Sequence, residues 1–285
     1  MNQDSRAFQF VRQLAAELGQ EKLELPAFPD VVGRLQAALT DANASVKDIV
    51  GVISSEPVLS ARLLGMANSA AMNPAGRSIN NINGAVTRLG FNLVRATAAA
   101  YAIGQMRRAQ ELEPIRSELE AVWRSSNEVA AICYVVAKRA FGRQPDEAML
   151  AGLLHQIGRL YILTHALRND PSLRDDPDFQ EVLSGWQAQI GSAILAEWGL
   201  PERIGEAVAQ QDELLGDDGD GMQPLSKLLA AAKLRNRMAH EPSLREAHPE
   251  VDDRMTAVNF GDRSFLDLVA SGQSDIETMQ QTLAT

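Results

Sequence analysis

Apolar residues recur at helical spacing along almost the whole chain. In the first segment, Ala7, Val11, Leu14 and Leu18 are separated by four, three and four residues. This spacing places them on one face of an α-helix, which turns once in about 3.6 residues. The three segments that follow show the same pattern, and none alternates as a β-strand would. The sequence therefore predicts an all-α fold.

Local signals mark several helix boundaries. Pro29 opens the second segment, because the backbone dihedral of proline suits the first turn of a helix. Ser45 is followed three residues later by Asp48, which is similar to a capping box with Asp in place of the usual Glu. Pro57 restarts the chain after the third segment, and Gly90 separates a short helix from a long Ala-rich one. Gly19 predicts the end of the first helix.

The charge balance limits the kinds of partner. The 285 residues include 27 Lys and Arg against 37 Asp and Glu, a formal charge of −10. Affinity for phosphate backbones comes mainly from basic side chains, so this balance argues against a nucleic-acid partner. Arg88, Arg95, Arg107 and Arg108 fall within one stretch without interleaved aromatic residues. We interpret them as charges on solvated helix faces.

Cysteine content and hydropathy indicate the compartment. The single cysteine, Cys133, excludes an internal disulfide, and its apolar surroundings predict a small buried side chain. The chain has no uncharged apolar run of about 18 residues, and its N-terminus lacks the apolar core of a secretion signal. We therefore expect a cytoplasmic protein with no membrane partner.

Signatures of several large enzyme classes are missing. There is no Gly-x-Ser-x-Gly elbow, no Gly-rich phosphate loop before a Lys and no Gly-x-Gly-x-x-Gly. Of the four histidines, His240 and His248 lie in charged, proline-flanked sequence typical of a surface loop. His155 instead falls in the apolar segment 152–160, which we expect to be the middle of one helix. An imidazole there needs a hydrogen-bond partner or a function.

An acidic, Gly-rich stretch precedes the segment that starts at Pro224. It has the composition of a calcium loop, but the alternating ligand spacing and the closing Glu of an EF-hand are absent. We interpret it as a solvated connector. Its acidic residues are Asp212, Glu213, Asp217, Asp218 and Asp220.

Residues 153–160, LLHQIGRL, resemble the LLHDIGKL signature of HD-type metal-dependent phosphohydrolases. Three further segments, LPAFPDVVGRL (25–35), SSEPVLSARLLGMANSA (54–70) and AVTRLG (85–90), together with WRSS (123–126), are similar to a narrower family. That family is HDOD, the HD-related output domain of bacterial signalling proteins. The resemblance covers about residues 20–240, and the segment 54–70 is its most specific part.

The resemblance implies two helical lobes and a role in signal transduction without an established catalytic activity. An N-terminal helix (1–22) would precede the HDOD domain (23–240). Pro114 would separate its N-terminal helical lobe (23–113) from an HD-like lobe (114–240). A helical extension (241–285) would follow, with enough apolar residues to dock on its own domain or on a second copy. These residues are Phe265, Leu266, Leu268 and Val269.

The same resemblance makes a catalytic metal site unexpected. HD enzymes hold a divalent metal ion with His and Asp side chains. Ser125 stands where the first His is expected, Gln156 replaces the Asp that follows His155, and Gln187 replaces a later His. Gln210 and Gln211 occupy the place of paired histidines. Because neutral amides are poor ligands, we expect no metal, no cofactor and no catalytic residues.

Two interpretations of His155 stay open at this point: a hydrogen-bonded core histidine, or a remnant that lines a polar pocket. Such a pocket would be neutral and would suit a small polar ligand such as a nucleotide base, although phosphates would lack basic partners. Arg159, placed four residues after His155 on the expected helix face, is the one candidate partner, unless it is an ordinary exposed or ion-paired residue. The pocket residues would be Ser125, His155, Gln156, Gln187 and Gln210, and Arg159 and Gln211 would be further possible ligand contacts.

The helix that ends near Asn68 is followed by a second candidate site. Asn68 and Ser69 precede a Pro- and Gly-containing loop that ends at Arg77. They either cap the helix and turn the chain or, as the resemblance suggests, form a contact surface between the lobes or with a partner.

The sequence thus leaves three functional hypotheses. The first is a non-catalytic signalling protein that acts by contact with other signalling proteins, with a homodimer as an alternative assembly. The second is a residual HD-type phosphohydrolase built around His155. The third is a sensor that binds a cyclic dinucleotide or another small nucleotide.

Overall fold

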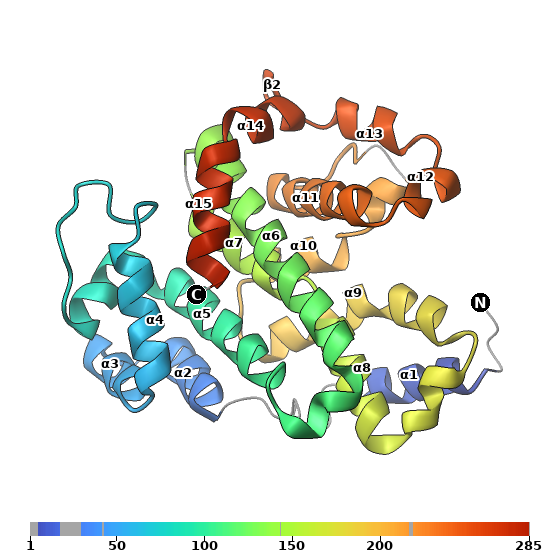
Figure 1. Ribbon diagram of the computed structural model, residues 1–285, viewed down its shortest axis with the longest axis horizontal. Helices are drawn as coiled ribbons and strands as arrows, with labels where there is room; N and C mark the ends of the chain where they lie inside the picture. Colours follow the sequence, from blue (N-terminus) through green and yellow to red (C-terminus); the bar gives the residue numbers. More distant parts are fainter. Residues whose placement is uncertain (1–4, 18–29, 42, 143, 217–218, 285) are drawn as a thin grey trace.

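The computed structural model describes residues 5–17, 30–41, 43–142, 144–216 and 219–284, and these are almost entirely helical (Figure 1). The predicted all-α class is confirmed. Two short strands, Asn259–Phe260 (β1) and Arg263–Ser264 (β2), pair antiparallel around a turn in which Gly261 has a φ of +66°. The hydrophobic pattern did not predict this hairpin, because two residues per strand are too few to show alternation.

The first lobe consists of four helices that pack on one another. At the start of the second of these, the predicted capping box is confirmed, because Asp48 N donates to Ser45 Oγ and Ser45 N donates to Asp48 Oδ2 at 2.8 Å. The last one is broken at Gly90, where φ is 74° and ψ is 168°, as predicted. The helices are Asp30–Thr40 (α2), Val46–Ser54 (α3), Pro57–Asn68 (α4) and Ile82–Met106 (α5).

The second lobe is built around one long helix, α6 (Arg116–Ala140), which packs against α7, α11 and the C-terminal helices (Figure 1). The predicted boundary residue, Pro114, lies just before α6 in the 3₁₀ helix η1 (Gln110–Ile115). The remaining helices of this lobe are α7 (Pro145–Leu154), α8 (Ile157–Asn169), η2 (Pro171–Asp175), α9 (Phe179–Glu197), α10 (Glu202–Ala209), η3 (Glu213–Leu215) and α11 (Pro224–His240).

The N-terminal helix, α1 (Arg6–Glu17), packs against α9 of the second lobe. The rings of Phe8 and Trp186 meet edge to face at 6.0 Å between centroids. The expected end at Gly19, the expected start at Pro29, the boundary between residues 22 and 23 and the motif residues 25–29 lie outside the described residues, as do Asp217 and Asp218.

Two glycines let the helices around the later site approach closely. A Cβ atom on Gly152 would lie 2.5 Å from Ala130 Cα, so α7 can cross α6 only because this position has no side chain. A Cβ atom on Gly158 would lie 2.0 Å from the carbonyl oxygen of Gln187, which sets the crossing of α8 and α9. Both contacts fix the backbone next to His155 and Gln187.

The prediction of one continuous helix through His155 is wrong. Helix α7 ends at Leu154, His155 is its C-cap, and α8 begins at Ile157. His155 and Arg159 therefore do not share a helix face. The break was hidden because almost every residue of α7 and of the start of α8 is buried, so no polar stripe changes direction at the junction.

The C-terminal extension docks on its own chain. It consists of α12 (Ser243–Ala247), α13 (Val251–Ala257), the hairpin, α14 (Phe265–Ser271) and α15 (Gln273–Ala284). Helices α14 and α15 lie along α6 (Figure 1). Three of the four predicted apolar residues are buried, and Leu266 is 38% exposed. The first of the two predicted docking modes is thus confirmed, and no contact in the structure tests the second copy.

Cys133 is completely buried, as predicted, and burial raises the pKa of its thiol. Among the described residues, no single helix is both long enough and apolar enough to cross a membrane.

Candidate functional site

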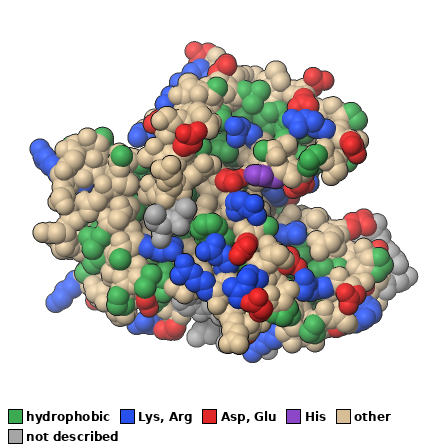
Figure 2. All heavy atoms as spheres, in the orientation of Figure 1, with side chains coloured by type: hydrophobic (Ala, Val, Ile, Leu, Met, Phe, Trp, Pro, Cys, Tyr) green, Lys and Arg blue, Asp and Glu red, His purple; other side chains and the backbone are tan. Residues whose placement is uncertain are grey.

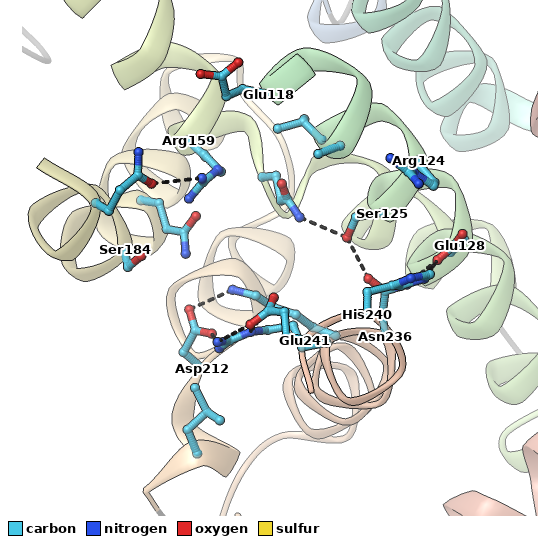
Figure 3. Close-up of a pocket in the computed structure, with 18 of the residues that line it drawn as sticks. Glu118, Arg124, Ser125, Glu128, Arg159, Ser184, Asp212, Asn236, His240 and Glu241 are labelled. Atoms are coloured by element: carbon cyan, nitrogen blue, oxygen red, sulfur yellow. Dashed lines mark hydrogen bonds and ion pairs between the residues drawn. The ribbon is translucent and has the colours of Figure 1, made fainter. Parts of the chain in front are cut away.

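A cavity of about 950 Å³ opens in the second lobe between α6, α8, α9 and α11 (Figure 3). The space-filling view shows the molecule hollowed there, with acidic, basic and histidine side chains near the mouth (Figure 2). Ser125, Gln156 and Gln187 line the cavity, so the structure brings together three of the predicted pocket residues. They come from α6, from the junction of α7 and α8, and from α9.

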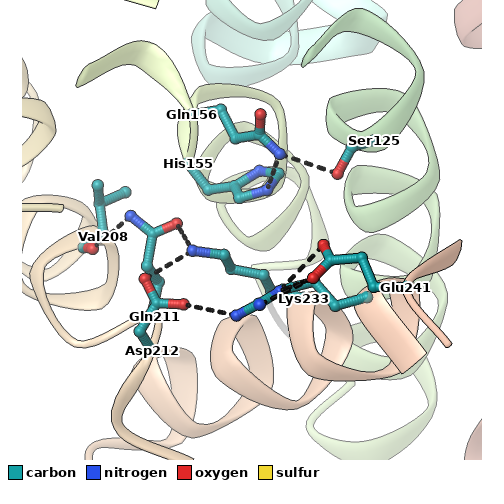
Figure 4. A network of polar contacts seen from close by, with 9 residues as sticks. Ser125, His155, Gln156, Val208, Gln211, Asp212, Lys233 and Glu241 are labelled. Atoms are coloured by element: carbon teal, nitrogen blue, oxygen red, sulfur yellow. Dashed lines mark hydrogen bonds and ion pairs between the residues drawn. The ribbon is translucent and has the colours of Figure 1, made fainter. Parts of the chain in front are cut away.

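One chain of hydrogen bonds links two of these positions, Ser125 and Gln156, to the buried His155 (Figure 4). Gln156 Nε2 donates to Ser125 Oγ at 3.0 Å, and Ser125 Oγ donates to Asn236 Oδ1 at 2.9 Å. The second hydrogen of Gln156 Nε2 points to His155 Nε2 at 3.3 Å. His155 Nδ1 lies 2.6 Å from the carbonyl oxygen of Gly152.

These contacts define the state of His155. A carbonyl oxygen only accepts, so Nδ1 carries the proton and Nε2 accepts from Gln156. The imidazole is therefore neutral and both nitrogens are used. Burial, followed by the positive charge of Lys233, lowers the pKa of His155 to about 3. His155 is completely buried and does not line the cavity, which confirms the core-histidine interpretation.

The buried ammonium group of Lys233 lies at the cavity, where the sequence pattern did not predict it. Lys233 Nζ donates to Gln211 Oε1 at 2.9 Å and to Asp212 Oδ2 at 2.7 Å (Figure 4). Gln211 in turn donates to the carbonyl oxygen of Val208 at 2.8 Å. Burial lowers the pKa of Lys233, and the neighbouring Asp212 carboxylate opposes that shift. The assignment of Asp212 to a solvated connector is therefore wrong.

The predicted neutral character of the pocket is also wrong. Four basic residues line it, and four acidic residues balance them. Helix α11 and the start of α6 bring these charges together from segments about a hundred residues apart, which no local pattern reveals. The basic residues are Arg124, Arg159, Lys233 and Arg237, and the acidic ones are Glu118, Glu128, Asp212 and Glu241.

Most of these charges are paired. Arg237 forms an ion pair with Glu241 at 2.8 Å and lies 3.8 Å from Asp212. Glu128 accepts from Asn236 and, at 2.9 Å, from His240. The expectation that His240 lies in a surface loop is wrong, since it ends α11 with a half-exposed side chain at the cavity.

Two arginines of the cavity lack an ion pair with any described residue. Arg159 is largely buried, and its closest polar contact is Gln180 Oε1 at 3.4 Å from Nη2. Burial lowers the pKa of Arg159, while the more distant Glu118 and Glu241 oppose the shift. Arg124, labelled at the edge of the cavity in Figure 3, also lines it and forms no ion pair with a described carboxylate.

The last two predicted pocket positions lie elsewhere. Gln211 is buried below the cavity through its bond to Lys233. Gln210 is the C-cap of α10 and does not line the cavity, so its place in the predicted cluster is wrong. The residues that the sequence missed are Asp212, Lys233, Asn236 and Glu128. Lys233 could have been noticed, because it interrupts an apolar run of α11.

The residues present do not fit a divalent metal ion. In the described parts of the chain, no group of three or more His, Cys, Asp or Glu side chains could hold one. The one imidazole at the HD position uses both nitrogens, and its neighbours offer amides and a hydroxyl. The ammonium of Lys233 adds a positive charge that would repel a second cation.

The predicted interaction loop has a local structural role. Asn68 Nδ2 donates to the carbonyl oxygens of Leu64 at 3.0 Å and Ile79 at 2.7 Å, and Asn68 Oδ1 accepts from Ile79 N. Ser69 Oγ donates to the carbonyl oxygen of Met66 at 2.8 Å. These bonds support the cap-and-turn interpretation.

The loop between α4 and α5 projects from the body of the molecule (Figure 1), and Arg77 within it is exposed. At its base, Tyr134 of α6 donates to Met72 Sδ at 3.5 Å, so the loop does touch the second lobe. Contact with a partner stays a prediction.

The sequence model of the HDOD domain family matches residues 25–214, which is more than half of the chain. The chain therefore belongs to the HDOD domain family, and the predicted family is confirmed.

Solved structures share the fold over almost the whole chain. A protein from Shewanella amazonensis SB2B, provisionally named a metal-dependent phosphohydrolase, is 26% identical with a TM-score of 0.68, covering 97% of this chain and 99% of that one. An HDOD domain protein of unknown function from Geobacter sulfurreducens is 22% identical with a TM-score of 0.58, covering 96% and 97%.

A protein from Marinobacter aquaeolei VT8, provisionally named a signal transduction protein, is 17% identical with a TM-score of 0.53. The match covers 100% of this chain and 67% of that one. Identities this low show likeness of fold alone for the Geobacter and Marinobacter proteins. Among curated proteins, an uncharacterized protein of Treponema pallidum (strain Nichols) is 27% identical over 206 residues. The match covers 67% of this chain but only 38% of that protein.

Proposed function

We propose that this chain is a non-catalytic regulatory protein of bacterial signal transduction, which acts by binding other signalling proteins. The observation that carries the proposal is the buried ammonium of Lys233 beside the neutral, fully bonded His155. In an HD hydrolase this region would hold a cation that activates water. Here the ammonium group of Lys233, held by Gln211 and Asp212, supplies the positive charge. Unlike a metal ion, an ammonium group has no coordination site at which a water could be activated.

The remaining groups offer no replacement for metal chemistry. A general base needs a basic lone pair that faces the cavity. His155 Nε2 is directed at the Gln156 amide, and the pKa of the imidazole lies far below neutral. The carboxylates of Glu128 and Glu241 are held by Asn236, His240 and Arg237. The other two carboxylates of the cavity, Glu118 and Asp212, accept from Arg174 and Lys233. The cavity is thus arranged for binding or for stability rather than for hydrolysis.

Hydrolysis assays test this proposal. The wild-type protein is incubated with a chromogenic phosphodiester, a chromogenic phosphomonoester and nucleotides, in separate buffers with manganese, magnesium and ferrous iron. We expect no turnover above a matched His155→Ala preparation. Metal-dependent turnover that His155→Ala abolishes would make the chain a residual HD-type hydrolase and would overturn the proposal.

A second candidate function is the binding of a small nucleotide in the same cavity. It is favoured by Arg124 and Arg159, the two guanidinium groups of this cavity that form no ion pair with a described residue. A guanidinium is a strong partner for phosphate oxygens. The cavity volume of about 950 Å³ lies within the range of small-molecule sites.

Thermal unfolding in the presence of mono- and dinucleotides, including cyclic dinucleotides, tests this candidate. A ligand that binds only the folded state raises the midpoint with the logarithm of its concentration. We expect the shift to disappear in Arg159→Met and to persist in Arg168→Met, an exposed position on the same helix outside the cavity. A nucleotide shift that survives Arg159→Met and Arg124→Met alike would place binding elsewhere.

A further inference from the structure

A second cavity, of about 400 Å³, lies where the two lobes meet. Helices α2 and α5 of the first lobe form one side, and α7 with the turn between α9 and α10 forms the other. The walls are mostly apolar, and they include Leu35, Ala98, Leu150, Leu154 and Leu200. This cavity is separate from the charged one, with which it shares no lining residue.

One charged group of this cavity is not balanced by the protein. Arg95, on α5, donates from Nη2 to the carbonyl oxygen of Leu39 at 2.8 Å. Its Nε is buried and has no hydrogen-bond partner among the described residues. Glu197 also lines the cavity, with an exposed side chain, and among the described residues no ion pair joins it to Arg95. Burial alone lowers the pKa of Arg95, with no carboxylate to oppose the shift.

An unbalanced guanidinium in an apolar cavity is costly for the protein alone. Charges that are taken partly out of water are normally paired or hydrogen-bonded, and Arg95 is half-buried with its Nε unpartnered. The interpretation of Arg95 as a charge on a fully solvated helix face is therefore corrected to a half-buried guanidinium. An anion placed in the cavity would supply the missing partner, and its apolar part would lie against the leucine and alanine side chains.

The cavity rim joins the lobes directly. Gln36 Nε2 of α2 donates to the carbonyl oxygen of Trp198, which follows α9. A Cβ atom on Gly199, where φ is +64°, would lie 2.5 Å from Thr40 Cγ2, so the turn and α2 are in close contact. A ligand inside this rim would touch both lobes at once.

We propose that this inter-lobe cavity binds a small organic monocarboxylate with an apolar body, such as a medium-chain fatty acid. The single guanidinium matches one negative charge, whereas a phosphate dianion would leave a charge unbalanced in an apolar surrounding. The volume lies at the lower end of the range for small-molecule sites. Bound there, the ligand would link α2 of one lobe to the α9–α10 turn of the other.

Three probes separate charge from apolar contact: octanoate, which has both, octanol, which has only the apolar chain, and acetate, which has only the charge. Binding to the full chain is measured by calorimetry and by tryptophan emission, to which Trp198 in the cavity wall contributes beside Trp123 and Trp186. We expect octanoate to bind and both other probes to bind at least about tenfold more weakly. Octanol lacks the charge-assisted hydrogen bond, and acetate lacks the apolar chain that would be buried.

Three variants locate the site. Arg95→Met removes the charge and should weaken octanoate binding at least about tenfold. Gly33→Leu fills the cavity from α2, where nothing lies within 4 Å of a new Cβ atom, and should abolish binding. Gly51→Leu is the matched control, because it is also an exposed helical glycine with open space but lies outside the cavity.

Equal affinity for octanoate and octanol would overturn the assignment of a carboxylate. Binding that is unchanged in Gly33→Leu or in Arg95→Met would overturn the site itself. Absence of octanoate binding to the wild-type chain at millimolar concentration would also overturn the proposal. None of these results depends on whether the charged cavity in the second lobe binds a nucleotide.

Discussion

His155 shows how burial, rather than residue type, decides what a histidine does. Its two nitrogens contact the carbonyl oxygen of Gly152 and the amide of Gln156, and the side chain is completely inaccessible to solvent. Because the pKa falls to about 3, the ring stays neutral in the folded state at pH values where an unfolded chain is protonated.

This difference predicts a pH dependence of stability. Below about pH 6.5 the unfolded state takes up a proton that folded His155 does not, so the free energy of unfolding falls by up to about 1.4 kcal/mol per pH unit. In His155→Asn this contribution is absent. Denaturant unfolding from pH 7 to pH 4 should therefore give curves for wild type and variant that converge as the pH falls. Parallel curves would contradict the assigned state of His155.

The ion pair of Lys233 and Asp212 predicts that the contributions of these two residues to the free energy of unfolding are coupled. Lys233→Met leaves Asp212 and Gln211 without the ammonium and should lower the free energy of unfolding by about 1–3 kcal/mol. Replacing both members, in Lys233→Met with Asp212→Leu, should cost less than the sum of the single changes. Urea unfolding of the two single variants and of the double variant measures these losses. As the control, Lys227→Met on the same helix should change the free energy of unfolding by no more than about 0.5 kcal/mol. Additive losses would show that the pair is not coupled.

At the residue scale, the sequence predicted the positions that carry the family motif. Ser125, Gln156 and Gln187 line the cavity as expected. Lys233 and Asn236 could not be predicted in the same way, because they meet those positions only after α11 packs against α6.

Among the helices, the boundaries that could be predicted from the sequence are those marked by local signals. Ser45 and Asp48 cap α3, and Gly90 breaks α5, because each effect depends on a few neighbouring residues. The junction of α7 and α8 could not be predicted, since both helices are buried on nearly all sides. The lack of a side chain at Gly158 lets α8 lie against α9, and the hydrophobic periodicity of the sequence does not indicate this contact.

The crossing at Gly158 gives an element-scale prediction. Gly158→Ala would place a Cβ atom 2.0 Å from the carbonyl oxygen of Gln187, so the helices must separate. We expect a loss of about 1–3 kcal/mol in the free energy of unfolding. Gly51→Ala, with open space around the new methyl group, should instead gain about 0.5–1 kcal/mol. Equal effects at the two positions in urea unfolding would contradict the close crossing.

At the scale of the whole molecule, the C-terminal extension belongs to the folded domain. Phe265 is completely buried, and α14 and α15 pack along α6. Phe265→Ala should therefore lower the free energy of unfolding by about 3–5 kcal/mol in one transition that tryptophan emission also reports. Leu266→Ala, at the neighbouring exposed position, should change it by no more than about 0.5 kcal/mol. A separate early transition for the extension would show that it folds independently.

The overall arrangement was predictable in outline. The helical pattern and the family resemblance predicted the class, and Pro114 marked the passage to α6. The charges of the large cavity were not predictable, because Arg124, Asp212 and Arg237 are far apart in sequence and a net charge says nothing about where opposite charges meet.

The proposed function places the ammonium group of Lys233 in the region in which an HD hydrolase would hold a metal ion. Its most direct test is the metal content of the untagged protein by mass spectrometry, after incubation with manganese, magnesium and ferrous iron and removal of the free ions. We expect far less than one ion per chain, and the same content in His155→Ala. One ion per chain that is lost in His155→Ala would contradict it.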